Sequence, residues 1–411
     1  MASRPRGTRD FAPAEMARRR AAEATLRGVF GRFGYREIQT PVFEELELFT
    51  AKSGDGIISE LYDFTDKGDR RMTLRPELTA PAMRMYFADH AFDPKPIKWC
   101  YFGACYRYDR PQEGRYREFW QFGCEQIGAG TPLAYAELIA LGASCFEAMG
   151  LKDIEFRVGH VGILRGAVER LGLDDDARAA AMRLIDKRDL DGLHGHLAGA
   201  DKEAVHDLFT LLEATDLEGL EGEAADELGQ TLACLADFGV DVTVDLGIAR
   251  GLDYYTGIVF EAHCQELEAQ SQLLGGGGYD LSHVFGGQPT PTMGFGLGFD
   301  RALVALEKQG HDAGAAPGPA VLFGALSDAA RGVVVRHVAA LRRGGLDVEL
   351  DLLGRKPGQI AKHADAVGAR FLVLVGDRDL EQGQVQVKSL HDGERHDVAL
   401  AELEAWLVAR A

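Results

Sequence analysis

Hydrophobic residues recur along this chain with two different periods, which predict helices in some stretches and strands in others. A helix is expected from about Pro13 to Phe33, because apolar residues there repeat at helical spacing: Leu26, Val29, Phe30 and Phe33. The next apolar stretch, Tyr35 to Pro41, is short enough for a strand. Since proline has no backbone N–H, we expect this strand at the edge of a sheet.

The clearest strand pattern lies between Trp99 and Ile127, where two strands are joined by a polar loop. Successive side chains of a strand point to opposite faces, so the second strand has an aromatic face with Trp120, Phe122 and Cys124. Its other face is polar, with a glycine at the centre: Arg117, Gln121, Gly123 and Glu125. We expect the aromatic face in the core and the polar face beside a ligand that lies close to the backbone.

Arginine side chains gather around this hairpin. Arg107 precedes the loop, and the loop itself carries Arg110, Gln112, Arg115 and Arg117. A planar guanidinium group matches the oxygens of phosphate, so this cluster favours a phosphate ligand. An ordinary hairpin with solvated loop charges would also carry such residues. The adjoining face with Gln121 and Glu125 favours a ligand, because half-buried charges are costly unless a partner satisfies them.

Downstream of the hairpin, the patterns predict two further regions. An apolar helix, roughly Leu133 to Met149, leads into a strand from Ile154 to Val158. From about Gly159 to Asp241, alanine, leucine and charged residues dominate and predict short helices. Beyond a small-residue linker, Ala313 to Pro319, strands and helices alternate, which predicts a compact α/β domain with a mixed sheet. Three histidines of the helical region lack a Cys or acid at metal-ligand spacing and are expected on the surface: His194, His196 and His206.

Two glycine-rich stretches follow the helical region. Gly275 to Gly278 lets the backbone approach a neighbour closely, but it is neither a dinucleotide fingerprint nor a P-loop. In residues 294–303, GFGLGFDRAL, alternating glycines leave one strand face bare for a flat adenine. Arg301 opens the next helix, a position that suits a phosphate tail. Glycine-rich strand ends are also common in strands without a ligand.

Composition narrows the class of protein. The 411 residues predict two or three domains, and 46% hydrophobic residues are typical of a globular protein. A net charge of −19 opposes non-specific binding to polyanions, so a nucleic acid would need a local basic patch, and a broadly basic DNA-coating protein is disfavoured. The 6 cysteines form no CxxC pair, which indicates neither a zinc site nor a disulfide framework. Without a signal peptide or a long apolar run, a soluble cytoplasmic protein is expected, with no membrane partner.

Several stretches resemble one enzyme family, in the family's order. Residues 102–125, FGACYRYDRPQEGRYREFWQFGCE, resemble motif 2 of class II aminoacyl-tRNA synthetases in its histidyl form. Residues 250–261, RGLDYYTGIVFE, resemble a signature peptide of histidyl-tRNA synthetases and are the most discriminating match. The first helix and edge strand resemble motif 1, and residues 294–303 resemble motif 3. The C-terminal region resembles an anticodon-binding domain.

Two of these matches also have simpler interpretations. Arg75-Pro76-Glu77-Leu78-Thr79 resembles the family's R-P-E-x-T element, in which Glu77 and Thr79 would share a face of an extended segment. Alternatively, Thr79 caps the next helix and Glu77 faces solvent. Tyr254 and Tyr255 would point to opposite faces of a strand, where one binds a ligand, or both would pack in a core or interface. Many family members carry Arg before the Tyr279-Asp280 pair, so its replacement by Gly278 predicts the loss of any binding contact from that arginine.

The resemblance implies a class II synthetase fold. An α+β catalytic domain built on an antiparallel sheet flanked by helices would occupy residues 1–318, with a helical insertion at about 160–241. A C-terminal α/β anticodon-binding domain would occupy residues 319–411. The implied enzyme is a cytoplasmic, homodimeric histidine–tRNA ligase. It would activate L-histidine with ATP to histidyl-adenylate and transfer it to the 3′ end of tRNA(His).

The resemblance also implies a role for each matching residue. Arg107 and Arg250 would be catalytic and hold the α-phosphate of ATP, Arg301 would hold the γ-phosphate, Arg115 would also bind ATP, and Mg²⁺ would bridge the phosphates without a dedicated metal site in the chain. Histidine would be bound by Glu125 and Tyr255 at the ring and by Glu77, Thr79 and Gln121 at the ammonium group, with Leu78 and Tyr254 beside them. For the tRNA acceptor end the candidates are Arg110, Gln112 and Arg115, and for the anticodon Arg355, Lys356 and Lys362.

Two alternatives use the same fold. A non-catalytic regulatory subunit of ATP phosphoribosyltransferase would bind histidine and charge no tRNA. It is expected to lack the C-terminal domain and parts of the motifs, which this chain has. A synthetase-like RNA-binding or signalling protein without catalysis is disfavoured by the same intact arginines.

Overall fold

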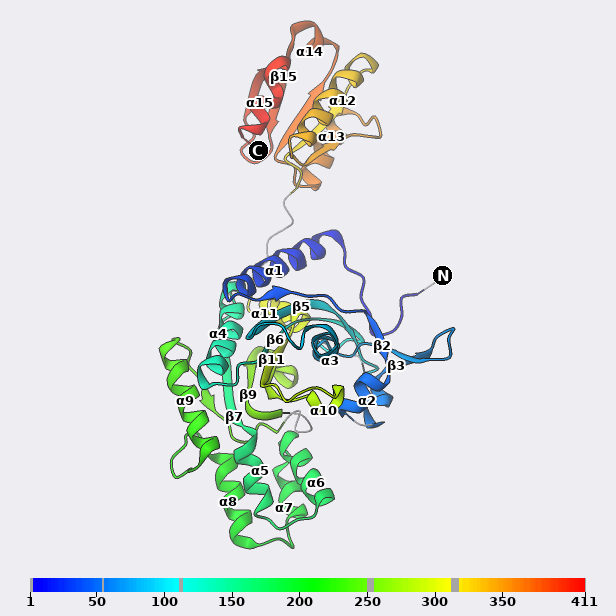
Figure 1. The fold of residues 1–411 in the computed structure, drawn as a ribbon. Coiled ribbons are helices and arrows are strands. Elements are labelled where there is room, and N and C mark those ends of the chain that lie inside the picture. The colour runs from blue at the N-terminus through cyan, green and yellow to red at the C-terminus, as the bar shows by residue number, and fades with distance from the viewer. Residues whose placement is uncertain (1–2, 54, 111–113, 250–254, 312–317, 411) are drawn as a thin grey trace. The chain divides into compact units, whose positions relative to one another are not determined.

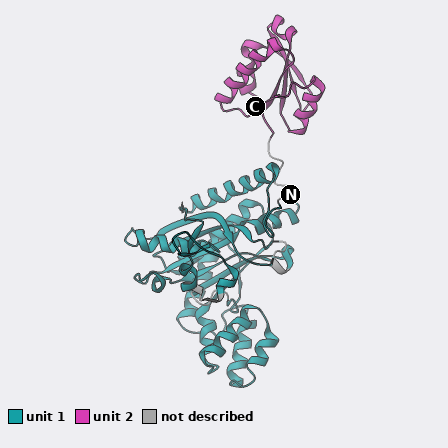
Figure 2. Ribbon diagram, turned by 90° about the vertical axis from the view of Figure 1, so that its right-hand side faces the viewer, with its two compact units in different colours: residues 1–313 teal, residues 314–411 magenta. Residues whose placement is uncertain are grey.

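The computed structural model describes residues 3–53, 55–110, 114–249, 255–311 and 318–410 (Figure 1). The chain forms two compact units, residues 1–313 and residues 314–411 (Figure 2). Each unit has its own sheet and its own hydrophobic core. Among the described helices, none is both long enough and apolar enough to cross a membrane.

The first unit is built on an eight-stranded sheet. In spatial order its strands are β1 (Arg36–Glu37), β5 (Ile97–Tyr106), β6 (Glu118–Ile127), β11 (Thr292–Gly298), β10 (Gln272–Tyr279), β9 (Tyr255–Cys264), β7 (Ile154–His160) and β8 (Thr243–Val244). The six central strands are antiparallel, and only β1 and β8, at the two edges, run parallel to their neighbours. The predicted class II fold and the edge position of the strand before Pro41 are therefore confirmed.

Helices cover the aromatic face of this sheet. They are α1 (Pro13–Arg32), α4 (Pro132–Met149) and α11 (Phe299–Lys308). Leu26, Val29 and Phe30 of α1 are buried against this face, and the rings of Phe30 and Phe122 stack with centroids 5.7 Å apart. As predicted, Phe122 and Cys124 lie in the core, whereas Trp120 is half-buried at its margin. The opposite, polar face is left for the site.

Smaller elements flank the polar face. A three-stranded sheet orders β2 (Phe43–Glu45), β4 (Arg71–Leu74) and β3 (Tyr62–Thr65). Short helices accompany it: α2 (Glu47–Ser53), η1 (Asp55–Glu60), α3 (Thr79–Met85) and the π-helical turn η2 (Tyr86–His90). Two further turns, η3 (Gln265–Gln270) and α10 (Ser282–Phe285), stand beside the ends of β10.

Between β7 and β8 the chain makes a helical region. Its helices are α5 (Val161–Glu169), α6 (Asp175–Asp186), α7 (Leu190–His196), α8 (Lys202–Glu213) and α9 (Glu223–Asp237). Asp174, Asp189 and Asp201 cap three of them by accepting hydrogen bonds from backbone N–H groups of the first turn. The three histidines predicted on the surface, His194, His196 and His206, are exposed.

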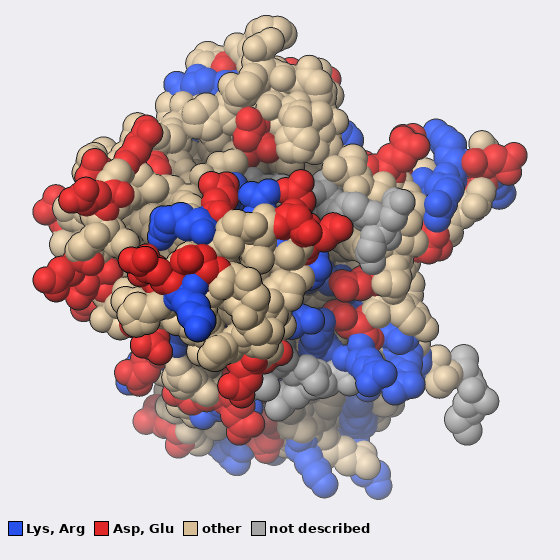
Figure 3. Space-filling model, turned by 90° about the horizontal axis from the view of Figure 1, so that it is seen from below, with Lys and Arg blue, Asp and Glu red and all other residues tan. Residues whose placement is uncertain are grey.

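The charge on the molecular surface is unevenly distributed. Seen from below (Figure 3), acidic side chains spread over the left of the view, and basic side chains gather toward its lower right.

The second unit is a five-stranded mixed sheet with helices. Its strand order is β13 (Val348–Leu350), β12 (Val321–Ala325), β14 (Phe371–Val375), β15 (Gln384–Ser389) and β16 (Arg395–Ala399). The first three strands are parallel and the last two antiparallel, which confirms the predicted mixed α/β domain. The helices are α12 (Asp328–Arg343), α13 (Pro357–Ala366), α14 (Asp377–Gln382), η4 (Leu400–Glu402) and α15 (Leu403–Val408).

Candidate active site

A cavity of about 700 Å³ lies on the polar face of the large sheet. Strands β6, β9, β10 and β11 form its floor, and the loop of residues 107–117, which joins β5 and β6, borders it. Segments far apart in the sequence meet here, because the sheet order places β6 beside β11 and β10 beside β9. The cavity lining includes these residues singled out from the sequence: Glu77, Thr79, Arg107, Arg115, Gln121, Tyr255 and Arg301.

Other residues singled out from the sequence lie elsewhere. Leu78 is buried behind the cavity in an apolar cluster with Tyr101 and Cys105. Arg110 is exposed on the loop. Gln112, Arg250 and Tyr254 fall outside the described residues.

Glu125 is the most deeply buried acid of the site, with none of its surface exposed. One carboxylate oxygen, Oε1, accepts a hydrogen bond of 2.7 Å from the Tyr101 hydroxyl, and Oε2 accepts one from the Tyr279 hydroxyl. Burial raises the pKa of Glu125 to about 7, because the charged form loses its hydration. The group can therefore change protonation near neutral pH and act as acceptor or donor toward a ligand.

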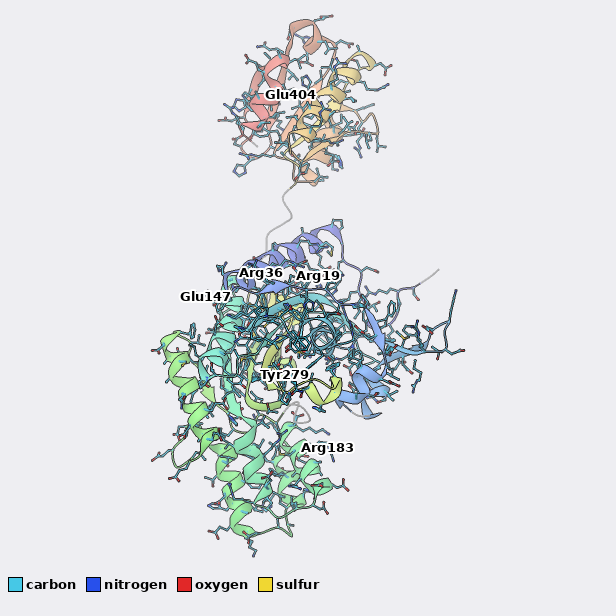
Figure 4. All side chains as sticks on the ribbon, viewed as in Figure 1. Arg19, Arg36, Glu147, Arg183, Tyr279 and Glu404 are labelled. Carbon is cyan, nitrogen blue, oxygen red and sulfur yellow. The ribbon has the colours of Figure 1, made fainter. Side chains whose placement is uncertain are left out.

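The two tyrosines that hold Glu125 were not predicted. Tyr101 lies on β5 opposite Gly123, and Tyr279 ends β10 at the centre of the unit (Figure 4). Both hydroxyls are buried, which raises their pKa values well above the usual range. The strand alternation could have placed Tyr101 on the polar face. Tyr279 gave a weaker signal, because its contact with Glu125 depends on β11 pairing between β10 and β6.

Glu77 and Thr79 lie at the start of α3 rather than on an extended segment. The Glu77 carboxylate accepts hydrogen bonds from the backbone N–H groups of Thr79 at 2.6 Å and Ala80 at 3.1 Å. The extended segment and the Thr79 cap are therefore both wrong, because Glu77 rather than Thr79 caps the helix. Both side chains nevertheless line the same cavity. A carboxylate is favoured there because it meets unpaired N–H groups and the positive end of the helix dipole.

Hydroxyl and amide groups continue the polar wall from α3 to β6. The Thr79 hydroxyl lies 3.3 Å from the Tyr101 hydroxyl, which links α3 to the Glu125 cluster. Gln121 lies on the same strand face as Glu125, and its Oε1 is 3.3 Å from the Cys105 sulfur. The Tyr255 ring is 6.5 Å from the Tyr279 ring, measured between centroids. This end of the cavity thus offers acceptors and donors to a small polar ligand.

Five arginines of the described chain line the cavity, and three of them were singled out from the sequence: Arg107 and Arg115 on the loop, and Arg301 on α11. Arg107 donates to the Pro76 carbonyl at 3.0 Å. Arg301, in the first turn of α11, donates to the carbonyls of Gly114 and Gln272, each at 3.0 Å. Backbone carbonyls thus fix the direction of both guanidinium groups. Arg115 instead forms a bidentate ion pair with Asp109, in which its Nε and Nη2 donate hydrogen bonds of 3.0 and 2.9 Å. The Arg115 side chain is nearly half exposed.

Glycines keep the floor between these two ends flat. Gly275 of β10 pairs with Gly296 of β11, and both line the cavity. The next glycine of β11 on this face, Gly294, pairs with Glu125 of β6. A Cβ atom on Gly294 would lie 2.1 Å from Glu125 Oε2 and 2.3 Å from the Cys124 carbonyl oxygen, so only glycine fits. A flat ligand could lie on this surface, as the sequence pattern predicts.

Gly278 faces the other side of the sheet. A Cβ atom there would lie 2.0 Å from the Tyr135 hydroxyl on α4, and its strand partner Met293 is a core residue. Position 278 therefore faces away from the cavity, and the predicted absence of an arginine contact from this position stays a prediction. The alternation of the strand directs position 278 toward the helical layer, where Tyr135 fills the space.

Comparison with known proteins gives consistent matches along the chain. A family model described as histidyl-tRNA synthetase matches residues 7–302, and one described as anticodon binding domain matches residues 321–410. The chain is 44% identical to a histidine–tRNA ligase of Methanoregula boonei, over 98% of this chain and 99% of that protein. It is 44% identical to one of Archaeoglobus fulgidus, over 97% and 98%. The crystal structure of apo S. aureus histidyl-tRNA synthetase matches with a TM-score of 0.80 and 30% identity, over 99% of this chain and 100% of that one.

Proposed function

This chain belongs to the histidyl-tRNA synthetase family, and we propose from that membership how its cavity divides the work of a histidine–tRNA ligase. The enzyme is an aminoacyl-tRNA ligase that uses histidine, ATP and tRNA. Full-length similarity to curated histidine–tRNA ligases, including the anticodon-binding unit, favours this function over a regulatory subunit.

One observation carries the assignment of roles: carbonyl-anchored arginines line one cavity together with Tyr101, whose hydroxyl holds the buried Glu125 carboxylate directly behind it. Histidine would occupy the end with Glu125. An imidazole ring needs a partner for each nitrogen, and a group with a pKa near 7 can accept from one nitrogen or donate to it. Glu77, Thr79 and Gln121 would meet the ammonium group, with Tyr255 at the ring.

ATP would occupy the end with the arginines. As a carboxylate oxygen of histidine bonds to the α-phosphorus, the bond from that phosphorus to the bridging oxygen breaks and pyrophosphate leaves. Arg107 would stabilise the negative charge that builds up on the α-phosphate oxygens, Arg301 would hold the γ-phosphate, and Arg115 would also bind ATP. Arg250, which lies outside the described residues, is proposed to face the α-phosphate from the other side.

ATP is proposed to enter as its Mg²⁺ complex. In the described part of the chain, no three His, Cys, Asp or Glu side chains gather as a metal site, so phosphate oxygens would supply most of the coordination. The Glu261 carboxylate lines the cavity, where Gln272 and His263 hold its two oxygens at 2.9 and 3.0 Å. It suits a hard cation as a protein ligand. The ion would neutralise phosphate charge and orient the leaving pyrophosphate.

Transfer to tRNA is proposed to use both units. The first unit, as catalytic domain, would hold the acceptor end through Arg110, Gln112 and Arg115 on the loop. The second unit, as anticodon-binding domain, would use Arg355, Lys356 and Lys362. Arg355 is fixed by Asp351 at 2.7 Å, which leaves Lys356, exposed at the start of α13, as the more available cation. A cytoplasmic homodimer completes the proposal, and light scattering that shows a monomer would contradict its oligomeric part.

Histidine-dependent ATP–pyrophosphate exchange tests the central step. Each of the twenty amino acids is offered in parallel, and exchange is expected with histidine alone. Aminoacylation of tRNA(His) then tests transfer. Histidine binding by calorimetry without any exchange would contradict the assignment and favour a non-catalytic histidine sensor.

A further inference from the structure

A short N-terminal segment, Gly7 to Phe11, crosses from the loop of residues 107–117 to helix α11. At one end the Gly7 carbonyl accepts a hydrogen bond of 2.9 Å from the Arg117 backbone N–H. In the middle, the Arg9 guanidinium lies 3.6 Å from the centre of the Tyr116 ring. The same guanidinium donates to Asp300 Oδ1 at 2.5 Å. We call residues 7–11 the strap.

Asp300 is the point at which the strap meets the interior. Its side chain is 3% exposed, and Oδ1 accepts from both Arg9 and Arg19, the latter on α1 at 2.6 Å (Figure 4 labels Arg19). Its other oxygen, Oδ2, accepts from the Trp120 backbone N–H at 2.6 Å. One buried carboxylate thus joins the strap, α1, β6 and α11.

Arg9 is not required to neutralise Asp300. Arg19 is 6% exposed and already pairs with the carboxylate, so a buried charge would remain compensated without Arg9. The Nε of Arg9 is buried without a hydrogen-bond partner, which is a cost to the folded state. A residue kept for stability alone would not be expected in this arrangement, so a role in the site is favoured.

The residues that Arg9 contacts are sequence neighbours of two arginines of the site. Tyr116 follows Arg115, and Asp300 precedes Arg301. Both of these arginines line the cavity at its phosphate end. Arg301 also donates a hydrogen bond to the Gly114 carbonyl in the same loop. The loop is therefore connected to α11 twice, by this hydrogen bond and by the strap. Arg9 therefore contacts Tyr116 and Asp300, each of which is next in sequence to one of these two arginines. The two arginines themselves come from segments far apart in the chain.

We propose that Arg9 is a positioning residue for ATP: by bridging Tyr116 and Asp300, it sets the separation between the phosphate-facing loop and the first turn of α11. Misplacement of a positioned group by about 1 Å can cost on the order of a hundredfold in rate. The proposal rests on the roles of Arg115 and Arg301 given above, and it concerns adenylation rather than histidine binding.

The test compares Arg9→Ala and Arg9→Lys with Arg18→Ala in ATP–pyrophosphate exchange. Arg18 is a matched control, because it lies on α1 and reaches Glu307 of α11 at 3.9 Å through an exposed pair. The measured quantities are kcat, the KM for ATP, the KM for histidine and the thermal unfolding midpoint. Arg301→Ala is measured beside them.

Arg9→Ala is expected to lower kcat/KM for ATP by about ten- to a hundredfold. Its KM for histidine should stay within about twofold, because among the described residues no hydrogen bond joins the strap to Glu77, Thr79, Gln121 or Glu125. Arg9→Lys, which keeps the charge toward Asp300, should recover part of the loss, and Arg18→Ala should match the unchanged enzyme.

Two results would overturn the proposal. One is an unchanged kcat/KM for ATP in Arg9→Ala while Arg301→Ala is impaired; the strap would then be structural only. The other is an equal loss toward ATP and histidine together with a lower unfolding midpoint. If Arg301→Ala is also normal, the ATP site itself is misplaced and the proposal fails with it. Should Arg9→Ala not fold, the ATP-against-histidine split of Arg9→Lys decides.

Discussion

The two ends of the cavity are built in opposite ways. At the end with Glu125, polar groups are buried within the sheet, and neighbouring strands supply their hydrogen bonds. At the end with the arginines, charged groups come from a loop and a helix terminus, and backbone carbonyls aim them. The first arrangement suits discrimination, because a ligand that fails to pair a buried polar group is rejected strongly. The second suits a highly charged ligand whose transition state needs charge more than shape.

Removal of Arg107 should have the largest effect. Arg107→Ala removes a charge that is aimed at the developing α-phosphate charge, so kcat in pyrophosphate exchange should fall by on the order of 10²–10³. The fold should persist, because the Arg107 guanidinium is only part-buried and donates to a single carbonyl. Arg70→Ala, at an exposed pair with Asp66, is the control. Near-normal exchange by Arg107→Ala would refute the division of the cavity into two ends.

Glu125→Gln should remove the pH dependence of the unfolding free energy that the buried carboxyl group causes. The pKa of Glu125 rises from about 4.5 unfolded to about 7 folded. The folded state therefore holds a proton that the unfolded state releases between these values, so stability falls as pH rises from about 4.5 to about 7. From pH 5 to pH 8 the unchanged enzyme should lose on the order of 2–3 kcal/mol of unfolding free energy that the variant keeps.

Urea unfolding at both pH values measures this difference, because other titrating groups contribute equally to the two proteins. An identical pH dependence in enzyme and variant would show that Glu125 stays ionised in the folded state, and the buried end would then resemble the charged end.

Gln121→Ala should affect the histidine end alone. Loss of a hydrogen bond to a charged group costs roughly 1.5–3 kcal/mol, so the KM for histidine should rise about ten- to a hundredfold. The KM for ATP should change little. Steady-state exchange with each substrate varied in turn measures both, and a parallel rise in the two constants would show that the ends are not independent.

A change in ionic strength should have the smallest effect on the KM values, and it tests whether the two ends of the cavity differ in burial. Arg115 is nearly half exposed, so salt screens its field, whereas the Glu125 cluster is shielded from solvent. Between about 0.05 M and 0.5 M salt, the KM for ATP is expected to rise several-fold and the KM for histidine to stay nearly constant. Equal responses would contradict the contrast in burial.

Local periodicity predicted much of the fold. The alternation in residues 118–127 placed Phe122 in the core and Gln121 at the cavity, because a strand with one buried face must alternate. The apolar repeat of residues 13–33 predicted α1 to within one residue of its observed end. Motif order then brought together most of the site, which periodicity alone could not do.

The features that were missed depend on pairing over long sequence separations. The contact between Tyr279 and Glu125 requires the register of β10, β11 and β6. The side of the sheet on which position 278 lies follows from the same register. Asp300 receives Arg9 from nearly three hundred residues away, and the strap has no period that would mark it. Glu77 was misjudged because a helix start two residues later changes what an acid at that position can do.

Two glycines that pack against Tyr101 and Glu125 set a limit on redesign of this enzyme. At Gly123 and Gly294 an added Cβ atom would lie within 2.8 Å of backbone carbonyl oxygens, which no rotamer change can move. Even the smallest substitution is therefore a discontinuous step, and selection for a new amino-acid substrate has no gradual path through these positions. A mutant library with the best prospect would keep both glycines and diversify the side chains that ring them, at Thr79, Gln121 and Tyr255.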